Sequence, residues 1–284
     1  MQYWYTLLTK SECKNLDEFL QEKNFTWKVI SQPCFSEINE KRINIEKYKA
    51  NFRNDNFKFL GLSTKSMIQN DECFKYADNF KKDFKDSYFC YCGDSPDKRH
   101  SYLTMFLKEE IICDDKYNIY VSWMNNFEGL GGQKFVITPI RQKDNSVIQI
   151  ADIKHKRIMP LKTYEDERKA INIYLDYIKN KCTIMKSKKI NLNETVNMIF
   201  EDKINKKEKK FMNLRNANIK EYFREIFIKN NGDSIYDLYM AMSSFFCNVK
   251  SNRMSKEKED LIRYFNMVIK IHYELESFYK NFLK

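Results

Sequence analysis

The sequence predicts an α+β protein with a mixed α/β front half, residues 1–160, and an all-α, basic back half, residues 161–284. In the front half, β-rich aromatic runs alternate with helix-like stretches, which predicts one sheet of five to eight strands with helices beside it. After Pro160, apolar residues recur at helical spacing, which predicts a helical bundle that ends in a long terminal helix. We therefore expect two domains, divided at residue 160.

Strands are expected in the front half where short runs of β-branched and aromatic residues are bounded by turn residues. These runs are residues 3–8, 25–30, 57–62, 87–92, 117–123, 133–140, 146–150 and 153–159. Helices are expected between the early runs, starting at Thr9 or Ser11 and again at Thr64 or Ser66. A hydroxyl oxygen at these positions accepts a hydrogen bond from the free amides of a first turn, so the two helices should run to about residues 22 and 84.

A glycine-rich segment, residues 129–132, separates two of the expected strands. The tripeptide Gly131-Gly132-Gln133 is similar to the one with which class I peptide-release factors place a glutamine at the ester bond of peptidyl-tRNA. The residues that follow, 134–138, lack the asparagine of that family. We interpret the segment as a hairpin between the strands that end at Trp123 and begin at Gln133.

The back half is expected to begin with a helix at Thr163, because the acidic residues 165–167 oppose the positive end of a helix dipole. The apolar stripe of this helix is expected at Ile171, Tyr174, Ile178 and Cys182. Shorter helices are expected over residues 193–204 and 218–229. Gly232 is a suitable helix stop and Ser234 a suitable cap, which predicts a further helix to about residue 249.

The terminal helix, residues 256–282, carries apolar and aromatic positions at alternating steps of four and three. This seam consists of Leu261, Phe265, Val268, His272, Leu275, Tyr279 and Phe282. Such spacing is typical of a helix that packs along another helix. The partner is a helix of the same chain in a bundle, or the same helix of a second copy in a homo-oligomer.

Positive charge is concentrated in the back half. The chain has a formal net charge of +11, of which residues 161–284 contribute +8 (25 basic and 17 acidic side chains). The cations that we expect to bind an acidic protein surface or a nucleic acid are Lys186, Lys188, Lys189, Lys203, Lys206, Lys207, Lys209, Lys210 and Arg215. A local field of this kind steers acidic partners towards it.

No catalytic residue can be assigned from the sequence. There is no nucleophile-elbow motif, Walker loop or dinucleotide fingerprint. The carboxylates at Asp114, Asp115 and Asp152 do not form a convincing metal-binding set. The residue types at Cys90, Cys92, His100 and Cys113 are those that zinc prefers, but their spacing is not that of the common zinc ribbons. We expect reduced thiols, no metal and no cofactor.

The chain lacks a run of about 18 uncharged apolar residues, and its first residues lack a basic region followed by an apolar run. We expect a cytoplasmic protein with no membrane span. The residue usage, rich in Lys and Asn, is typical of AT-rich coding, as in a low-GC bacterium, its phage or another mobile element.

These observations favour a non-enzymatic interaction protein that binds an acidic partner, protein or nucleic acid, through its helical back half. An inhibitor of a host defence system, carried by a phage or mobile element, is one function of this class. The alternative is a nucleic-acid- or nucleotide-processing enzyme with its site in the front half. An enzyme requires a polar pocket within residues 1–160, whereas a binding protein requires an exposed patch.

Overall fold

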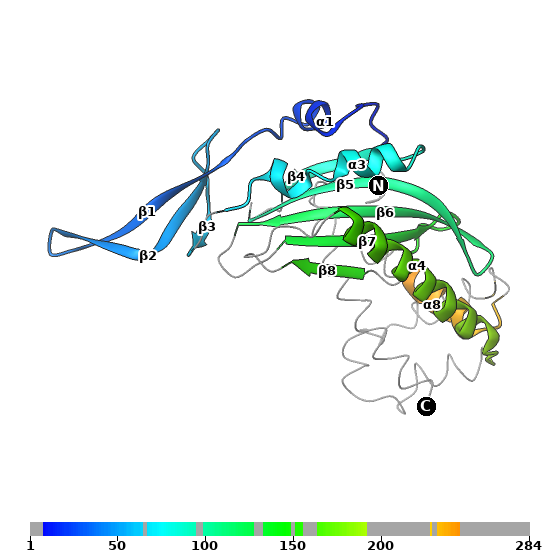
Figure 1. Ribbon diagram of the computed structural model, residues 1–284. Coiled ribbons are helices and arrows are strands. Elements are labelled where there is room, and N and C mark those ends of the chain that lie inside the picture. Colours follow the sequence, from blue (N-terminus) through cyan, green and yellow to red (C-terminus); the bar gives the residue numbers. More distant parts are fainter. Residues whose placement is uncertain are drawn as a thin grey trace, which may run out of the picture.

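The computed structural model describes residues 8–64, 67–94, 99–127, 133–148, 151–155, 164–191, 228 and 232–244. Within these ranges the chain forms two sheets, one of three strands and one of five, and all strand pairings are antiparallel. Five helices, α1 to α4 and α8, accompany the sheets (Figure 1).

The three-stranded sheet has the order β1-β2-β3, with strands at Val29–Ile38, Lys41–Arg53 and Phe59–Ser63. Asn39 and Glu40, with φ of 50° and 61°, form the turn between β1 and β2. Two consecutive residues with positive φ give the tight turn whose twist matches that of the flanking strands. β1 and β2 therefore form a hairpin, which projects away from the five-stranded sheet (Figure 1).

The five-stranded sheet has the order β4-β5-β6-β7-β8. Its strands are β4 Tyr88–Asp94, β5 His100–Ile112, β6 Asp115–Asn126, β7 Gln133–Arg141 and β8 Ala151–His155. Neighbours in sequence are neighbours in the sheet, and β5 joins β6 through a tight turn at Cys113 and Asp114, both with positive φ. The expected glycine-rich hairpin is confirmed in that β6 and β7 pair antiparallel on either side of residues 128–132.

Three short helices, α1 Leu16–Glu22, α2 Asn70–Phe74 and α3 Ala77–Asp83, cover one face of the larger sheet. Phe80 of α3 illustrates the packing, because its ring lies 5.5 Å from that of Trp123 and 5.9 Å from that of Phe135. Asn15, rather than Thr9 or Ser11, caps α1, since its side chain accepts a hydrogen bond from the Glu18 amide. The single helix expected up to residue 84 is instead the pair α2 and α3.

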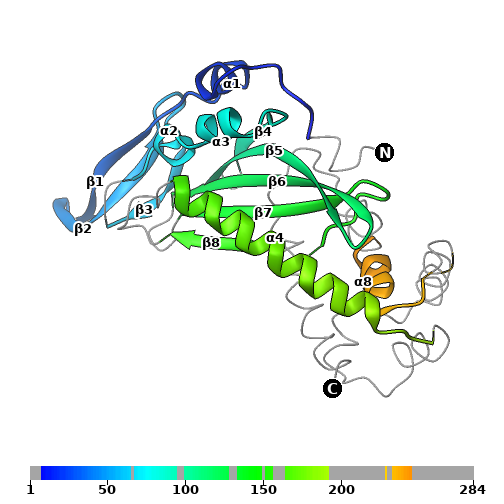
Figure 2. The ribbon, with the colours of Figure 1, turned by 45° about the vertical axis from the view of Figure 1, so that its right-hand side comes forward.

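Two helices of the back half join the same core. α4, Tyr164–Ser187, crosses the strands of the larger sheet obliquely, and α8, Ile235–Ser244, lies beside its C-terminal part (Figure 2). The stripe expected on α4 is confirmed, since all four of its predicted residues are buried. Ser234 caps α8 as expected, because its hydroxyl accepts a hydrogen bond from the Asp237 amide.

The predicted fold class is wrong in two respects. One mixed sheet was expected, but the strands form two antiparallel sheets, because the segments between paired strands have two to nine residues, fewer than the roughly twelve that a parallel crossover needs. A helical bundle was expected in the back half, but in its described residues α4 and α8 pack into the core of the sheet and form no bundle. The helices expected over 193–204 and 218–229 fall, save for residue 228, outside the described residues, and the terminal helix with its seam, Leu261 to Phe282, falls wholly outside them.

No helix in the described part of the chain combines the length and the apolar character that a membrane crossing requires. The predicted division at residue 160 stays a prediction.

Candidate interaction site

The β1–β2 hairpin, which we call the arm, is the candidate interaction site. Most of its residues beyond Ile30 in β1 and before Ala50 in β2 are exposed. A two-stranded hairpin buries little surface and is only marginally stable in water by itself. A long hairpin that extends into solvent therefore calls for an explanation other than the stability of the fold.

The strand register shows that one face of the arm is apolar. Residues paired across an antiparallel sheet lie on the same face, and faces alternate along each strand. Cys34 pairs with Ile45 and Ser36 with Ile43, while β3 continues the same face with Phe59 and Leu62 through their pairs Phe52 and Ala50. We call this set the apolar face: Ile30, Cys34, Ile38, Ile43, Ile45, Ala50, Phe52, Phe59 and Leu62. Gln32, Ser36 and Lys41 are its polar members.

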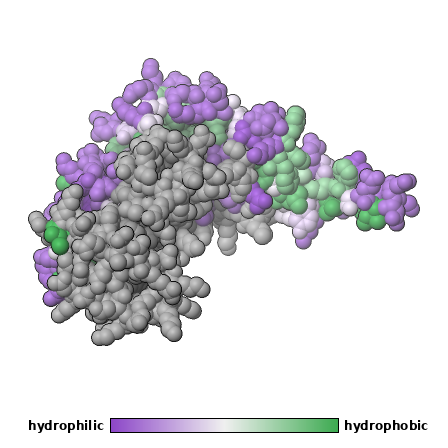
Figure 3. Space-filling view, turned by 180° about the vertical axis from the view of Figure 1, so that it is seen from behind, coloured by the Kyte–Doolittle hydropathy of each residue, from purple (hydrophilic) through white to green (hydrophobic). Residues whose placement is uncertain are grey.

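The apolar face is open to solvent. Ile38 is 54% exposed, Ile43 48%, Phe59 50% and Leu62 48%. Figure 3 shows hydrophobic side chains along the projecting arm. An antiparallel sheet with one packed face normally presents polar residues on the other. Together with Ile45, these side chains leave on the order of 400 Å² of apolar surface in water, a size at which a patch on a monomer is often functional.

The opposite face of the arm is fixed to the body of the protein at its base. The Arg53 guanidinium lies 4.3 Å from the centre of the Trp27 ring and forms ion pairs with Asp94 of β4 (2.6 Å) and with Asp55 (2.6 Å). Asn51 is fully buried, and its amide oxygen accepts a hydrogen bond from the Ser31 hydroxyl. The base is thus rigidly anchored, whereas the apolar face points away from these contacts.

β2 is also a cationic strand, with five basic residues and one acidic residue between Lys41 and Arg53. Arg53 is ion-paired at the base, but Lys41, Arg42, Lys47 and Lys49 form no ion pair with any described residue. Arg42 instead stacks on Phe35, with its guanidinium 3.6 Å from the ring centre. The arm therefore combines an apolar face with cations that form no ion pair with a described residue, although Glu37 lies across from Arg42.

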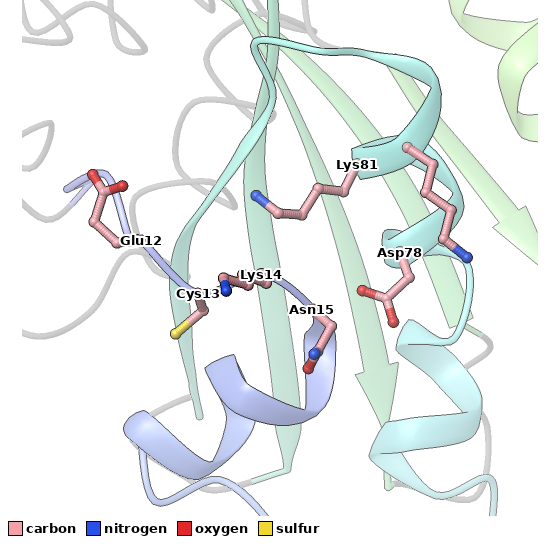
Figure 4. A pocket seen from close by; sticks show the side chains of 7 residues that line it. Glu12, Cys13, Lys14, Asn15, Asp78 and Lys81 are labelled. Atoms are coloured by element: carbon pink, nitrogen blue, oxygen red, sulfur yellow. The ribbon is translucent and has the colours of Figure 1, made fainter.

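A pocket of about 420 Å³ lies between the segment before α1 and helix α3. Figure 4 shows Asp78 and Lys81 projecting from α3 towards the segment from Glu12 to Asn15. Asp78 is engaged, since it accepts a hydrogen bond from the Leu16 amide (2.7 Å). The hydrogen bond that Cys13 donates to Glu22 (2.9 Å) raises the pKa of this thiol. The lining is polar, with two acidic side chains, three lysines, Asn15 and the Cys13 thiol.

The structure places only three of the nine cations predicted to bind a partner. Lys186 forms an ion pair with Asp237 (2.9 Å) and Lys189 with Asp233 (2.5 Å), so both connect the end of α4 to the start of α8. Burial of Asp237 disfavours its charge, but hydrogen bonds from Ser234 and Lys186 outweigh this and lower its pKa. Lys188 is exposed beside them. The remaining cations, Lys203 to Arg215, lie outside the described residues.

The residues considered for zinc do not meet. His100 and Cys113 lie at opposite ends of the 13-residue strand β5. Burial raises the pKa of the Cys90 thiol to about 12, and its sulfur accepts a hydrogen bond from the Phe106 amide. The described residues contain no group of three or more potential ligands that could hold a metal ion.

The sequence contains a signal for the arm that the sequence analysis missed. Ile43 and Ile45 alternate with the polar residues Arg42 and Asn44, and an Asn-Glu pair precedes them at a turn. This pattern is typical of a hairpin with one apolar face.

Comparison of the chain with known protein families, with curated proteins and with solved structures finds no match.

Proposed function

We propose that the protein is a non-enzymatic interaction protein that binds an acidic macromolecular partner, with the arm as its main contact. The observation that carries this proposal is the apolar face, which runs the length of a sheet that is anchored at its base and open to solvent beyond it. A protein gains nothing in stability from isoleucine side chains left in water, whereas burial against a partner gains about 25 cal/mol per Å². The cations of β2, which outnumber its single acidic residue, support an acidic partner.

This proposal moves the main contact from the back half to the arm. The basic segment from Lys203 to Arg215 stays a second predicted contact. An inhibitor of a host defence system stays a prediction that rests on coding style alone. The enzymatic alternative also stays a prediction, and the pocket at Cys13 is a polar pocket in the part of the chain where that alternative expects its site.

The proposal is tested by affinity capture from the cells in which the protein naturally occurs. The test variant is the double substitution Ile43→Ser and Ile45→Ser, and the matched control is Ile111→Ser. Ile111 is 63% exposed at the far end of β5, outside the arm. Exposed substitutions change stability by less than about 0.5 kcal/mol, so all three proteins should fold alike, which circular dichroism would verify.

We expect the wild type and the Ile111→Ser control to retain the same partner and the arm variant to lose it. Retention of that partner by the arm variant would show that the arm is not the contact.

A further inference from the structure

We infer that the apolar face of the arm binds an amphipathic α-helix with acidic flanks, supplied by another protein. This inference rests on the proposed function and specifies the chemistry of the partner. It follows from the dimensions of the face, from its charge and from the kind of side chains that it presents.

The dimensions of the face fit one helix. At its base the sheet is three strands wide, which is about 10 Å at a strand spacing of about 4.8 Å, and at its tip it is two strands wide. A helix with side chains is about 10–12 Å in diameter, so one helix covers this width and a second sheet would extend beyond it.

The length of the face fits as well. From Ile30 to Ile38, β1 rises about 27 Å, the length of a helix of about 18 residues. Same-face residues of a strand recur at about 6.7 Å and helix residues four apart recur at about 6 Å, so successive apolar side chains of the two can interleave.

The charge of the arm selects an acidic helix. Lys41 lies on the apolar face and Lys47 lies in the irregular segment of β2 that follows Ile45, whereas Lys49 pairs with Pro33 on the opposite face. None of the three forms an ion pair with a described residue. Carboxylates on a helix bound to the apolar face would meet the ammonium group of Lys41, with Lys47 on the neighbouring segment of the same strand. A second copy of the protein is disfavoured by the same charges, because a two-fold interface brings identical surfaces together and the chain carries +11.

The side chains of the face favour protein over nucleic acid. Four of its most exposed members, Ile38, Ile43, Ile45 and Leu62, are aliphatic. Single-stranded nucleic acids bind mainly through stacking on aromatic rings and through dense cationic grooves. Isoleucine and leucine side chains offer no ring for stacking, whereas they pack well against leucine side chains of a helix.

The probe for this inference is a labelled synthetic peptide of 18 residues, with leucine at positions i, i+3, i+4 and i+7 and glutamate on the flanks. A second peptide carries lysine in place of glutamate, and a third has the acidic composition with leucine distributed around the helix. Fluorescence anisotropy would measure the affinity of the full-length protein for each peptide. We expect the acidic amphipathic peptide to bind at least about tenfold more tightly than either of the others, a difference of about 1.4 kcal/mol.

Two variants locate the binding. Ile43→Ser with Ile45→Ser should weaken binding of the acidic peptide by about 100-fold, since two apolar contacts are lost. Lys41→Gln with Lys47→Gln should weaken it by about tenfold and flatten its dependence on salt, whereas Lys49→Gln, on the opposite face, should change it little. The control Ile111→Ser should bind like the wild type.

Equal binding of the acidic and basic peptides, or unchanged binding by the Ile43→Ser and Ile45→Ser variant, would overturn the inference. It would also be overturned by an oligonucleotide, or a second copy detected by light scattering, that binds the wild type and is lost in this variant. If the natural partner is captured through the arm but no peptide binds, the proposed function stands and the helical partner is wrong.

Discussion

Glu167 is an acidic residue that the fold buries in its apolar core. It lies in the first turn of α4, is 1% exposed, and accepts a hydrogen bond from the indole nitrogen of Trp123 (3.2 Å). Burial raises its pKa from the ordinary 4.5 to about 8, against the smaller opposing effects of Trp123 and Lys75. The folded protein therefore holds a neutral carboxyl group here at neutral pH.

This raised pKa makes stability depend on pH in a defined direction. The contribution of neutral Glu167 is fully present below about pH 4.5 and is lost as the pH rises towards 8, because the unfolded chain releases the proton first. Glu167→Gln stays neutral throughout and should therefore be more stable than the wild type at pH 8. The advantage should grow from pH 5 to pH 8 by up to roughly 1.4 kcal/mol per pH unit.

Urea unfolding at pH 5, 6, 7 and 8 would measure this advantage. Glu165→Gln, an exposed substitution in the same turn, is the control and should show no such growth. A stability difference for Glu167→Gln that stays constant across this range would contradict the assigned protonation state.

Sequence patterns predicted single residues well where local hydrogen bonds decide their role. Ser234 caps α8 as expected, because cap and helix are neighbours in sequence. The burial of Glu167 was not predicted, since an acidic residue in a first helical turn ordinarily faces solvent. Its burial depends on Trp123, which is 44 residues away.

At the scale of elements, α4 and β5 show why the sequence predicted one element and missed another. Its buried stripe recurs at helical spacing over 24 residues, long enough for the period to be unambiguous. β5, in contrast, was missed. All of its residues from Ser101 to Leu107 are buried, so they lack the alternation that marks a half-exposed strand.

The arm was missed for a different physical reason. Its strands do not pack on the core beyond their base. Their apolar residues are therefore not buried against another part of the described chain. Lys41, Lys47 and Lys49 further make β2 resemble a solvated segment. Under the proposed function, the arm is where the sequence follows the needs of a partner rather than those of the fold.

The two sides of α4 provide a test of how the back half contributes to stability. Ile178 is 1% exposed in the core, while Ile173 is 59% exposed on the outer side of the same helix. We expect Ile178→Ala to cost about 2–5 kcal/mol through lost apolar burial and a residual cavity. The control Ile173→Ala makes the same chemical change and should cost less than about 0.5 kcal/mol. Similar losses from both, measured by chemical denaturation, would mean that α4 does not dock as described.

For the whole molecule, the connection between the back half and the sheet is polar as well as apolar. Tyr236 of α8 donates a hydrogen bond to Asp115 (2.9 Å), and its hydroxyl lies 2.7 Å from that of Tyr117. Burial raises the pKa of both tyrosines, so both remain protonated donors. Arg141 completes the network through ion pairs with Asp115 (3.0 Å) and Asp144 (2.6 Å). The two tyrosines and Arg141 are buried at the junction, where these hydrogen bonds and ion pairs satisfy their polar groups.

Tyr236→Phe tests whether α8 and the sheet unfold as one unit. Removal of the hydroxyl takes a partner from Tyr117 and from Asp115 and should cost about 1–3 kcal/mol, because buried polar groups lose hydrogen bonds. Thermal unfolding would be followed by tryptophan fluorescence, to which Trp123 in the sheet contributes beside Trp4 and Trp27, and by circular dichroism at the helix band. The matched control is Tyr177→Phe, at a tyrosine that is 51% exposed on α4.

Since α4, α8 and the sheet share one core, we expect both signals to shift together to a lower temperature in Tyr236→Phe and to stay unchanged in the control. A helix signal that shifts alone would show that the residues after 160 unfold independently, as the predicted division of the chain implies.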